Sequence, residues 1–172
     1  MKQILVITYD NCDDTEAYYP LMRMREEGYA VTVASLEKKT ICGKHWFTVN
    51  ADLLPAEIDP AAYDALLLPG GTAPEKLRQN ADILAATRAF FDTYKPVAAI
   101  CHGPLILISA KVLRGRHCTC YPGILDDVIN AGALYENSPV VIDGNLITSR
   151  RPDDLPDFMR AFIQAVNQIE TR

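Results

Sequence analysis

A cysteine and a histidine stand side by side where an apolar segment ends abruptly. Residues 97–100 read Val-Ala-Ala-Ile, the next four are Cys101, His102, Gly103 and Pro104, and a second apolar run follows. Glycine in a sharp turn and proline at the first helical position are typical of a strand that passes through a tight turn into a helix. A thiol at a helix N-terminus is stabilised as the thiolate, which is the nucleophilic form. The pattern therefore predicts a nucleophile elbow, with Cys101 as the nucleophile and His102 as a base or an orienting group.

A buried structural cysteine is the alternative for Cys101, because burial is common for this residue type. The chain has five cysteines, an odd number, and their spacing does not resemble a disulfide framework. We therefore expect a reduced, cytoplasmic protein. Cys12 follows the first apolar strand and is either a redox partner of Cys101 or a thiol without a role. Cys118 and Cys120 lack the second ligand pair that a metal site needs, and we expect neither a metal nor a cofactor.

Glu16 lies just after the first predicted strand, where its carboxyl group has two possible roles. Asp13, Asp14, Thr15 and Glu16 form a pattern typical of a capping box, in which Glu16 would only cap the following helix. Alternatively, its carboxyl group lies in the same cleft as Cys101, where it could hydrogen-bond the sulfur and exchange a proton with it. The residues alone leave both roles open.

Paired glycines, Gly70 and Gly71, follow another apolar strand. They would let the backbone approach a ligand closely, and one of their N–H groups could face a developing oxyanion. The N–H of His102 would be the second donor, by analogy with hydrolase elbows. Thr72 and Glu75 fit a second capping box, which is the simpler interpretation of these two residues.

Of three further polar residues, only Tyr121 has a functional interpretation beside the structural one. Tyr121 precedes Pro-Gly and could place a phenol beside the same site, although packing or turn formation is the alternative. His117 belongs to a basic patch that we interpret as a solvated face, and we expect His45 at the surface.

Alternating strand and helix patterns must position these residues. Apolar, strand-like segments are expected at 3–8, 29–35, 64–68, 97–100 and 118–120, in a hairpin of 140–142 with 146–148, and in a short β-like element at 41–50. Helices are expected at 14–27, from near residue 73, and at 81–94, 104–110, 123–131 and 154–169. Continuous apolar strands between helices are typical of a parallel sheet covered on both faces. Ligands bind such sheets at the carboxyl ends of the strands, where the loops 9–14, 69–74 and 101–104 meet.

Length and composition limit the class of protein. The chain of 172 residues is long enough for one domain and short for two, and 49% of it is hydrophobic. A net charge of −5 and a pI near 5.1 argue against a stable nucleic-acid complex or binding to a membrane surface. No apolar run approaches the ~18 residues of a membrane span, and the N-terminus does not resemble a signal peptide. The acidic loop after the first strand excludes a dinucleotide-binding turn, and Pro69 stands where a phosphoacceptor domain needs an acid.

Motifs spread along the chain are specific when they are taken in order. They are Asp13-Asp14-x-Glu16, Tyr19-Pro20, Glu26-Glu27-Gly28, Asp64-Ala65-Leu66-x-Leu68-Pro69-Gly70-Gly71, Ala73-Pro74-Glu75, Ile100-Cys101-His102-Gly103-Pro104, Leu113-Arg114-Gly115-Arg116, Tyr121-Pro122-Gly123-Ile124, Asn130-Ala131-Gly132 and Thr148-Ser149-Arg150. This set closely resembles the PfpI family of intracellular proteases, within the superfamily of the parkinsonism-associated deglycase and the class I glutamine amidotransferases. The resemblance spans nearly all of residues 1–172, which we interpret as a single PfpI-like domain.

The resemblance implies an α/β fold, a flavodoxin-like three-layer sandwich with a mainly parallel sheet, and assembly into dimers or hexamers. It implies that Cys101 is the nucleophile, that Glu16 is the acid in contact with its sulfur, and that His102 is the basic partner. Glu75 is then the acid that orients His102, and in the PfpI group it comes from a neighbouring subunit.

The resemblance also assigns the remaining pocket residues. Tyr121 matches a pocket tyrosine of the PfpI group, and Gly71 and the N–H of His102 match the oxyanion site. Cys12 and Cys120 depart from the pattern, because a bulky apolar residue and a small residue are usual at these positions. Both thiols could lie near the pocket and react with a thiol probe.

The implied chemistry is attack of the Cys101 thiolate on a carbonyl carbon in a stress-response enzyme. The favoured activity is that of a glyoxalase or deglycase, acting on methylglyoxal, glyoxal or their protein and nucleotide adducts through Cys101 and Glu16. A peptidase or amidase using Cys101, His102 and Glu75 is the alternative, and it requires a protonated leaving group and a peptide groove. A non-catalytic redox sensor or chaperone is a third possibility. We also expect an unusually acidic Cys101 thiol, with Glu16 opposing ionisation unless it is protonated.

Overall fold

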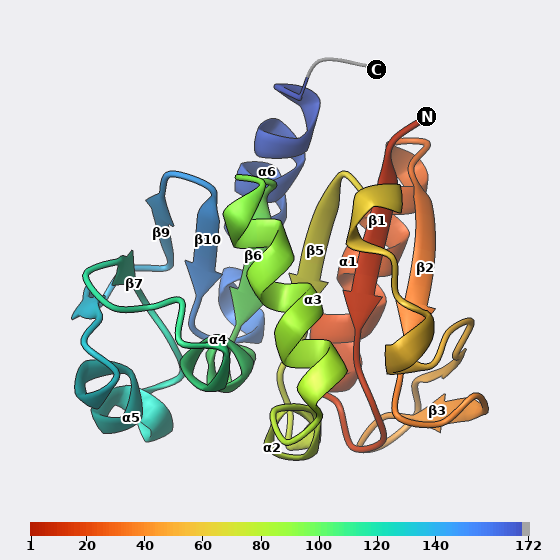
Figure 1. The fold of residues 1–172 in the computed structure, drawn as a ribbon, viewed down its shortest axis with the longest axis horizontal. Helices are drawn as coiled ribbons and strands as arrows, with labels where there is room; N and C mark the ends of the chain where they lie inside the picture. Colours follow the sequence, from red (N-terminus) through yellow and green to blue (C-terminus); the bar gives the residue numbers. More distant parts are fainter. Residues whose placement is uncertain (170–172) are drawn as a thin grey trace.

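A six-stranded sheet forms the centre of the molecule. The computed structural model describes residues 1–169, and its main sheet has the strand order β2-β1-β5-β6-β10-β9. In that order the strands are Ala30–Ala34, Gln3–Ile7, Ala65–Leu68, Val97–Ile100, Leu146–Ser149 and Val140–Asp143. Neighbouring strands are parallel except for β9, which pairs antiparallel with β10 at one edge. Figure 1 shows this sheet from its face.

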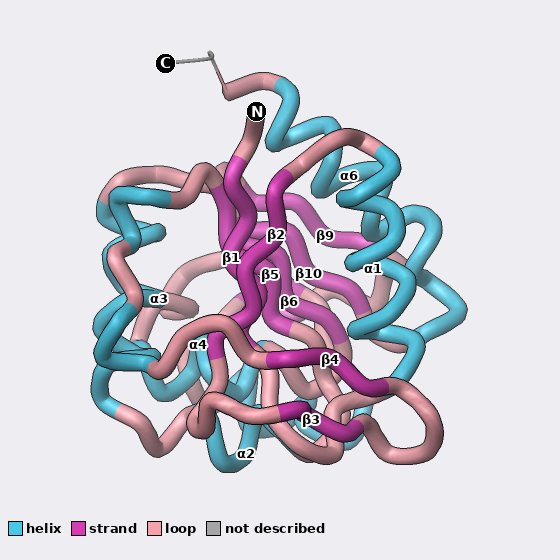
Figure 2. The backbone as a smooth tube through the Cα atoms, turned by 90° about the vertical axis from the view of Figure 1, so that its right-hand side faces the viewer, coloured by secondary structure: helices cyan, strands magenta, loops and turns pink. Residues whose placement is uncertain are grey.

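Helices cover both faces of the sheet. The helices are α1 (Asp14–Glu26), α2 (Ala73–Leu77), α3 (Ala81–Asp92), α4 (Pro104–Ala110), α5 (Leu125–Asn130) and α6 (Leu155–Asn167). Helices α1 and α6 lie on one side of the sheet and α3 lies on the other, as Figure 2 shows. The predicted α/β sandwich with a mainly parallel sheet is therefore confirmed. Within residues 1–169, no helix combines the length and the apolar character needed to cross a membrane.

The central strands β1, β5 and β6 are almost entirely apolar because both of their faces are buried. Every residue of β5 and β6 is fully buried, and so is β1 from its second residue, with exposures of 1% or less. Helix α6 contributes Phe158, Phe162 and Val166, which are also fully buried. Their spacing of four residues places them on one helix face, which packs toward the sheet.

Short elements differ most from the sequence prediction. The β-like segment 41–50 is an antiparallel hairpin of β3 (Thr40–Cys42) and β4 (Thr48–Asn50). The strand expected at 118–120 is only β7 (His117–Cys118), and it pairs with β8 (Leu134–Tyr135), which was not predicted. Two-residue strands carry no periodicity from which they could be recognised. The expected helix 123–131 begins as a 3₁₀ turn, η3 (Pro122–Ile124); the remaining turns are η1 (Pro55–Glu57), η2 (Pro60–Ala62) and η4 (Pro152–Asp154).

The three predicted ligand-binding loops meet at one edge of the sheet, because β1, β5 and β6 are neighbours. Backbone contacts join the first two loops directly. Asp13 N–H donates to the Gly70 carbonyl at 3.3 Å, and Cys12 and Gly71 pair as an isolated antiparallel bridge. The loop after β6, which carries Cys101, lies beside them.

Candidate active site

Cys101 stands at the turn between β6 and α4 in an unusual backbone conformation. Its φ of 61° lies in the left-handed region, which costs a non-glycine residue about 1–3 kcal/mol. The conformation is held by the Cys101 N–H, which donates to the Ser149 carbonyl at 3.0 Å. Gly103 is required in this turn, because a Cβ there would lie 2.4 Å from the carbonyl oxygen of Leu68. The predicted succession of strand, tight turn and helix is therefore present.

Polar groups surround the sulfur of Cys101, a residue that is 8% exposed. His102 Nδ1 lies 3.2 Å from Sγ, and the backbone N–H groups of Gly71 and His102 favour the thiolate form of the side chain. The imidazole stacks on the ring of Tyr121, with centroids 4.9 Å apart and an angle of 26° between the planes. Tyr121 N–H donates to the Cys101 carbonyl at 3.0 Å. The structure thus brings together the predicted cysteine, histidine, glycine and tyrosine.

Glu16 completes this cluster from the first turn of α1. It is fully buried, and its Oε2 accepts a hydrogen bond of 2.9 Å from Gly70 N–H. Its Oε1 is buried without a partner of good hydrogen-bond geometry among the described residues, and the Cys101 thiol is the side chain that interacts with this carboxyl group. A Cβ at Gly70 would lie 2.4 Å from Glu16 Oε2 and 2.8 Å from the Cβ of Cys101. Glycine at this position therefore allows the carboxyl group and the thiol to meet.

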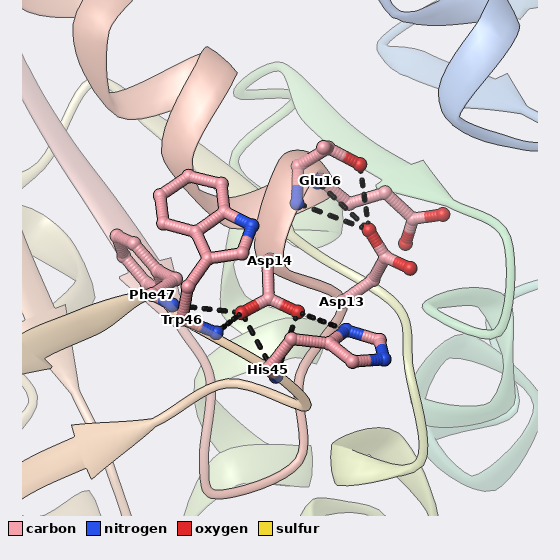
Figure 3. Close-up of polar contacts among 7 residues, drawn as sticks. Asp13, Asp14, Glu16, His45, Trp46 and Phe47 are labelled. Carbon is pink, nitrogen blue, oxygen red and sulfur yellow. Dashed lines mark hydrogen bonds and ion pairs between the residues drawn. The ribbon is translucent and has the colours of Figure 1, made fainter.

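The two capping-box alternatives are each resolved by side-chain direction. Asp13 does cap α1, and its Oδ1 accepts hydrogen bonds from the N–H groups of Thr15 and Glu16 at 3.1 and 3.2 Å. The Glu16 side chain does not return to the cap, because its Oε2 accepts a hydrogen bond from Gly70 N–H instead. Figure 3 shows the cap hydrogen bonds, which Asp13 accepts. Thr72 at the start of α2 makes no side-chain cap hydrogen bond. The simpler interpretation, a box of Thr72 with Glu75, is therefore wrong.

Glu16 and Cys101 are two acids buried side by side. Burial raises the pKa of Glu16 to about 7, and the charge of Asp13 adds to this shift. Burial also raises the pKa of the Cys101 thiol far above its ordinary value, the charge of Glu16 raises it further, and the N–H groups of Gly71 and His102 oppose this only in part. The expected acidic thiol is therefore wrong for the resting site, because burial and the neighbouring carboxylate outweigh the helix N-terminus. At neutral pH the thiol is therefore protonated, and the carboxyl group of Glu16 is protonated in part of the molecules.

His102 is held as a neutral base. Burial lowers its pKa, the charge of Lys44 lowers it further, and the charge of Glu75 opposes the shift. Glu75 itself is exposed on α2, and within the described part of this single chain it makes no hydrogen bond to His102. The contribution of Glu75 from a neighbouring subunit stays a prediction.

The other cysteines do not share this environment, and none of the five forms a disulfide. Cys12 is fully buried and faces Thr8, and burial raises the pKa of its thiol to about 11. Burial also raises the pKa of Cys118 to about 11 and that of Cys120 to about 12. Among residues 1–169, no group of His, Cys, Asp and Glu side chains is arranged to hold a metal ion.

A buried carboxylate that the sequence analysis missed anchors the loop between β3 and β4. Asp14 is 4% exposed and accepts the backbone N–H groups of His45, Trp46 and Phe47 at 3.1, 2.8 and 2.8 Å. The ring of His45 adds a contact of 3.0 Å through Nδ1, while the rest of that side chain is exposed (Figure 3). Burial opposes ionisation, but these donors outweigh it and hold the pKa of Asp14 well below its ordinary value. Gly43 was the available signal, because a Cβ there would lie 2.6 Å from the Asp14 carboxylate.

Comparison with known proteins identifies curated relatives that align over most of this chain. It is 50% identical to a deglycase of Pyrococcus abyssi over 162 residues, which cover 94% of this chain and 98% of that protein. It is 45% identical to protein/nucleic acid deglycase 2 of Escherichia coli, with 92% of this chain and 94% of that protein covered. A Bacillus subtilis relative named as a candidate cysteine protease, YraA, is 42% identical, with 92% of this chain and 95% of that protein covered. The expectation of a cysteine-type enzyme of the PfpI kind is confirmed.

Comparison with solved structures indicates the same relatives. A ThiJ/PfpI domain protein from Brachyspira murdochii superposes with a TM-score of 0.93 at 28% identity, and the match covers 98% of both chains. The family model described as DJ-1/PfpI matches residues 2–165. The predicted resemblance is therefore confirmed, and the chain belongs to the DJ-1/PfpI family.

Proposed function

We propose that this chain is a stress-response enzyme that uses the Cys101 thiolate to attack carbonyl carbon. Its activity is that of a glyoxalase or deglycase on methylglyoxal, glyoxal or their adducts with proteins and nucleotides. The observation that carries the proposal is the buried Glu16 carboxyl group, which faces the thiol and has a pKa of about 7. Such a group exchanges protons efficiently at neutral pH. The deglycase names of the relatives support the same chemistry.

The reaction with methylglyoxal begins as Glu16 accepts the thiol proton and sulfur bonds to the aldehyde carbon, which gives a hemithioacetal after the proton passes to the oxygen. Glu16 then removes the hydrogen of that carbon as a proton and delivers it to the neighbouring carbon through an enediol. The product is a lactate thioester. Water hydrolyses it to lactate and restores the thiol, so the net reaction is methylglyoxal plus water to lactate without an oxidant.

The backbone donors at the sulfur support this chemistry. The N–H groups of Gly71 and His102 favour the Cys101 thiolate, and we propose that they also serve as donors beside the carbon that sulfur attacks. An oxyanion on that carbon is stabilised by such preorganised donors. His102, kept neutral by burial, orients the sulfur through Nδ1.

A peptidase or amidase is the second candidate, and the His102 contact of 3.2 Å to the sulfur favours it. This activity needs Glu75 to orient His102, and we propose that Glu75 comes from a second copy of the chain in a dimer or hexamer. The relative named as a candidate cysteine protease supports this alternative. A non-catalytic redox sensor or chaperone is the remaining candidate. We keep a cytoplasmic location as a prediction.

The deciding measurement is lactate formation from methylglyoxal by the wild type and by Cys101→Ser, with a peptide-amide substrate in parallel. Lactate that disappears in the variant supports the proposal. Cys101-dependent amide cleavage without lactate supports the peptidase. If neither substrate is converted, reversible oxidation of Cys101 by dilute peroxide, read by mass spectrometry, would indicate the redox function.

A further inference from the structure

Lys44 lies on the loop that Asp14 anchors. Two successive backbone contacts connect it, through Cys12, to Gly71 beside the site. Its N–H donates to the Cys12 carbonyl at 3.1 Å, and Cys12 pairs with Gly71 in the isolated bridge. Paired backbones lie about 5 Å apart. The adjoining Gly70 contacts the cysteine, because a Cβ there would lie 2.8 Å from the Cβ of Cys101. The long side chain of Lys44 therefore starts close to the mouth of the site.

The ammonium of Lys44 acts on both sides of the cysteine. Its charge stabilises the carboxylate of Glu16 and disfavours the protonated form of His102. Lys44 is exposed, and within residues 1–169 its ammonium forms no ion pair and no hydrogen bond. A cation on the loop beside the site is thus free to bind an external anion.

We propose that Lys44 is the specificity residue of this site and binds a phosphate or carboxylate group on the carbonyl substrate while Cys101 attacks the carbonyl carbon. Asp14 is then a positioning residue, because it fixes the backbone of residues 45–47 and so the place from which Lys44 reaches. This inference rests on the proposed function and narrows its substrates to carbonyl compounds and adducts that carry an anionic group.

The first test compares alkylation of Cys101 by iodoacetate and by iodoacetamide, which differ in a carboxylate and an amide. Peptide mass spectrometry assigns the label among the five cysteines. In Lys44→Gln the ratio of the iodoacetate rate to the iodoacetamide rate should fall about two- to fivefold, the range of an exposed ion pair. Lys44→Arg should keep the wild-type ratio. Lys38→Gln is the matched control, since Lys38 pairs with Glu57 at 3.1 Å and is half exposed.

Salt supplies an independent check of the same ratio. At about 1 M salt the Debye length is about 3 Å, so the difference between wild type and Lys44→Gln should nearly vanish. A ratio that is the same in both proteins at low salt overturns the inference. A ratio that falls equally in Lys38→Gln also overturns it, because the effect would then belong to net charge.

The second test uses turnover and separates the two anion sources. The paired substrates are the glyoxal adducts of guanosine and guanosine 5′-monophosphate, and the methylglyoxal hemithioacetals of N-acetylcysteine amide and N-acetylcysteine. We expect a higher kcat/KM for the anionic member of at least one pair, and we expect Lys44→Gln to remove that preference. The ratio of the two kcat/KM values within a pair is the measured quantity, because loss of the Lys44 charge also acts on Glu16 and so changes turnover of both members. A preference that persists in Lys44→Gln refutes the role of Lys44. If no adduct is turned over but the alkylation ratio responds as expected, the proposed function fails and the anion site stands.

Discussion

Three neighbouring carboxyl groups at the start of α1 have three different tasks. Asp13 caps the helix, Asp14 anchors a distant loop, and Glu16 faces the Cys101 thiol. The spacing in the sequence predicted that at least one of them would cap, and it placed Glu16 at the correct edge of the sheet. It could not divide the tasks, because spacing gives the position of a residue and not the direction of its side chain. It also gave the wrong sign for the Cys101 pKa, since burial is a property of the packed molecule.

Replacing Asp13 by Asn should move the pH profile of the enzyme. Asn keeps the helix cap but removes the negative charge that raises the pKa of Glu16. Glu16 acts as a base only above its pKa, so a lower pKa lets activity begin at lower pH. The acid limb of the pH profile of kcat/KM for methylglyoxal should therefore shift to lower pH. An acid limb at the wild-type position would show that another group controls it.

Glu16→Gln should separate the reactivity of the thiol from turnover. Loss of the general base should reduce lactate formation by about 10²–10⁴-fold. Alkylation of Cys101 by iodoacetamide should become faster at a fixed pH, because the charge that raises the thiol pKa is gone. Glu26→Gln, an exposed position on the same helix, is the matched control. Slower alkylation together with lost turnover would indicate a damaged site instead.

At the scale of elements, long periodic segments were predicted well and short ones were not. The buried strands and helices α1, α3 and α6 follow from runs of apolar residues at strand or helix spacing. Strand β8 and the anchoring of the loop after β3 depend on contacts between segments far apart in the chain. Asp14 contacts residues more than thirty positions away, and local sequence rules do not describe such a contact.

Asp14→Asn should destabilise the fold, because the amide presents donors where three backbone N–H groups need an acceptor. We expect a loss of about 2–4 kcal/mol in the free energy of unfolding, measured with denaturant. The exposed Asp126→Asn is the control. The pKa of Asp14 is lowered in the folded state, so its stabilisation is complete above the unfolded value near ~3.9 and is lost as the pH falls through the folded value. If the difference in unfolding free energy between wild type and variant stayed constant below about pH 4, this assignment would be contradicted.

At the scale of the whole molecule, a single chain does not provide His102 with a hydrogen bond to Glu75, the acid predicted to orient it. Glu75 is exposed and makes no hydrogen bond to His102 within the described residues. The resemblance to the PfpI group predicted a second copy as the source of this acid. A sequence read alone predicts the fold of one chain far better than contacts between copies, because exposed residues carry no periodic signal.

Complementation between two inactive variants tests whether amide cleavage uses a shared site. Cys101→Ser and Glu75→Gln should each lose amidase activity, and their mixture should recover it as hybrid oligomers form. In a dimer, random pairing gives about a quarter of the wild-type activity. A mixture as inactive as its parents would place Glu75 outside the catalytic site or within the same chain. Light scattering on each variant serves as the control, because hybrid oligomers form only if both variants are oligomeric.

The left-handed backbone of Cys101 sets stability and chemistry against each other at one position. Glycine and asparagine tolerate that conformation best, and neither carries a thiol. A library selected only for thermal resistance would therefore tend to discard the cysteine, whereas a library selected for turnover would retain it at a cost to the fold. The identity of residue 101 in evolved variants thus records which of the two pressures acted.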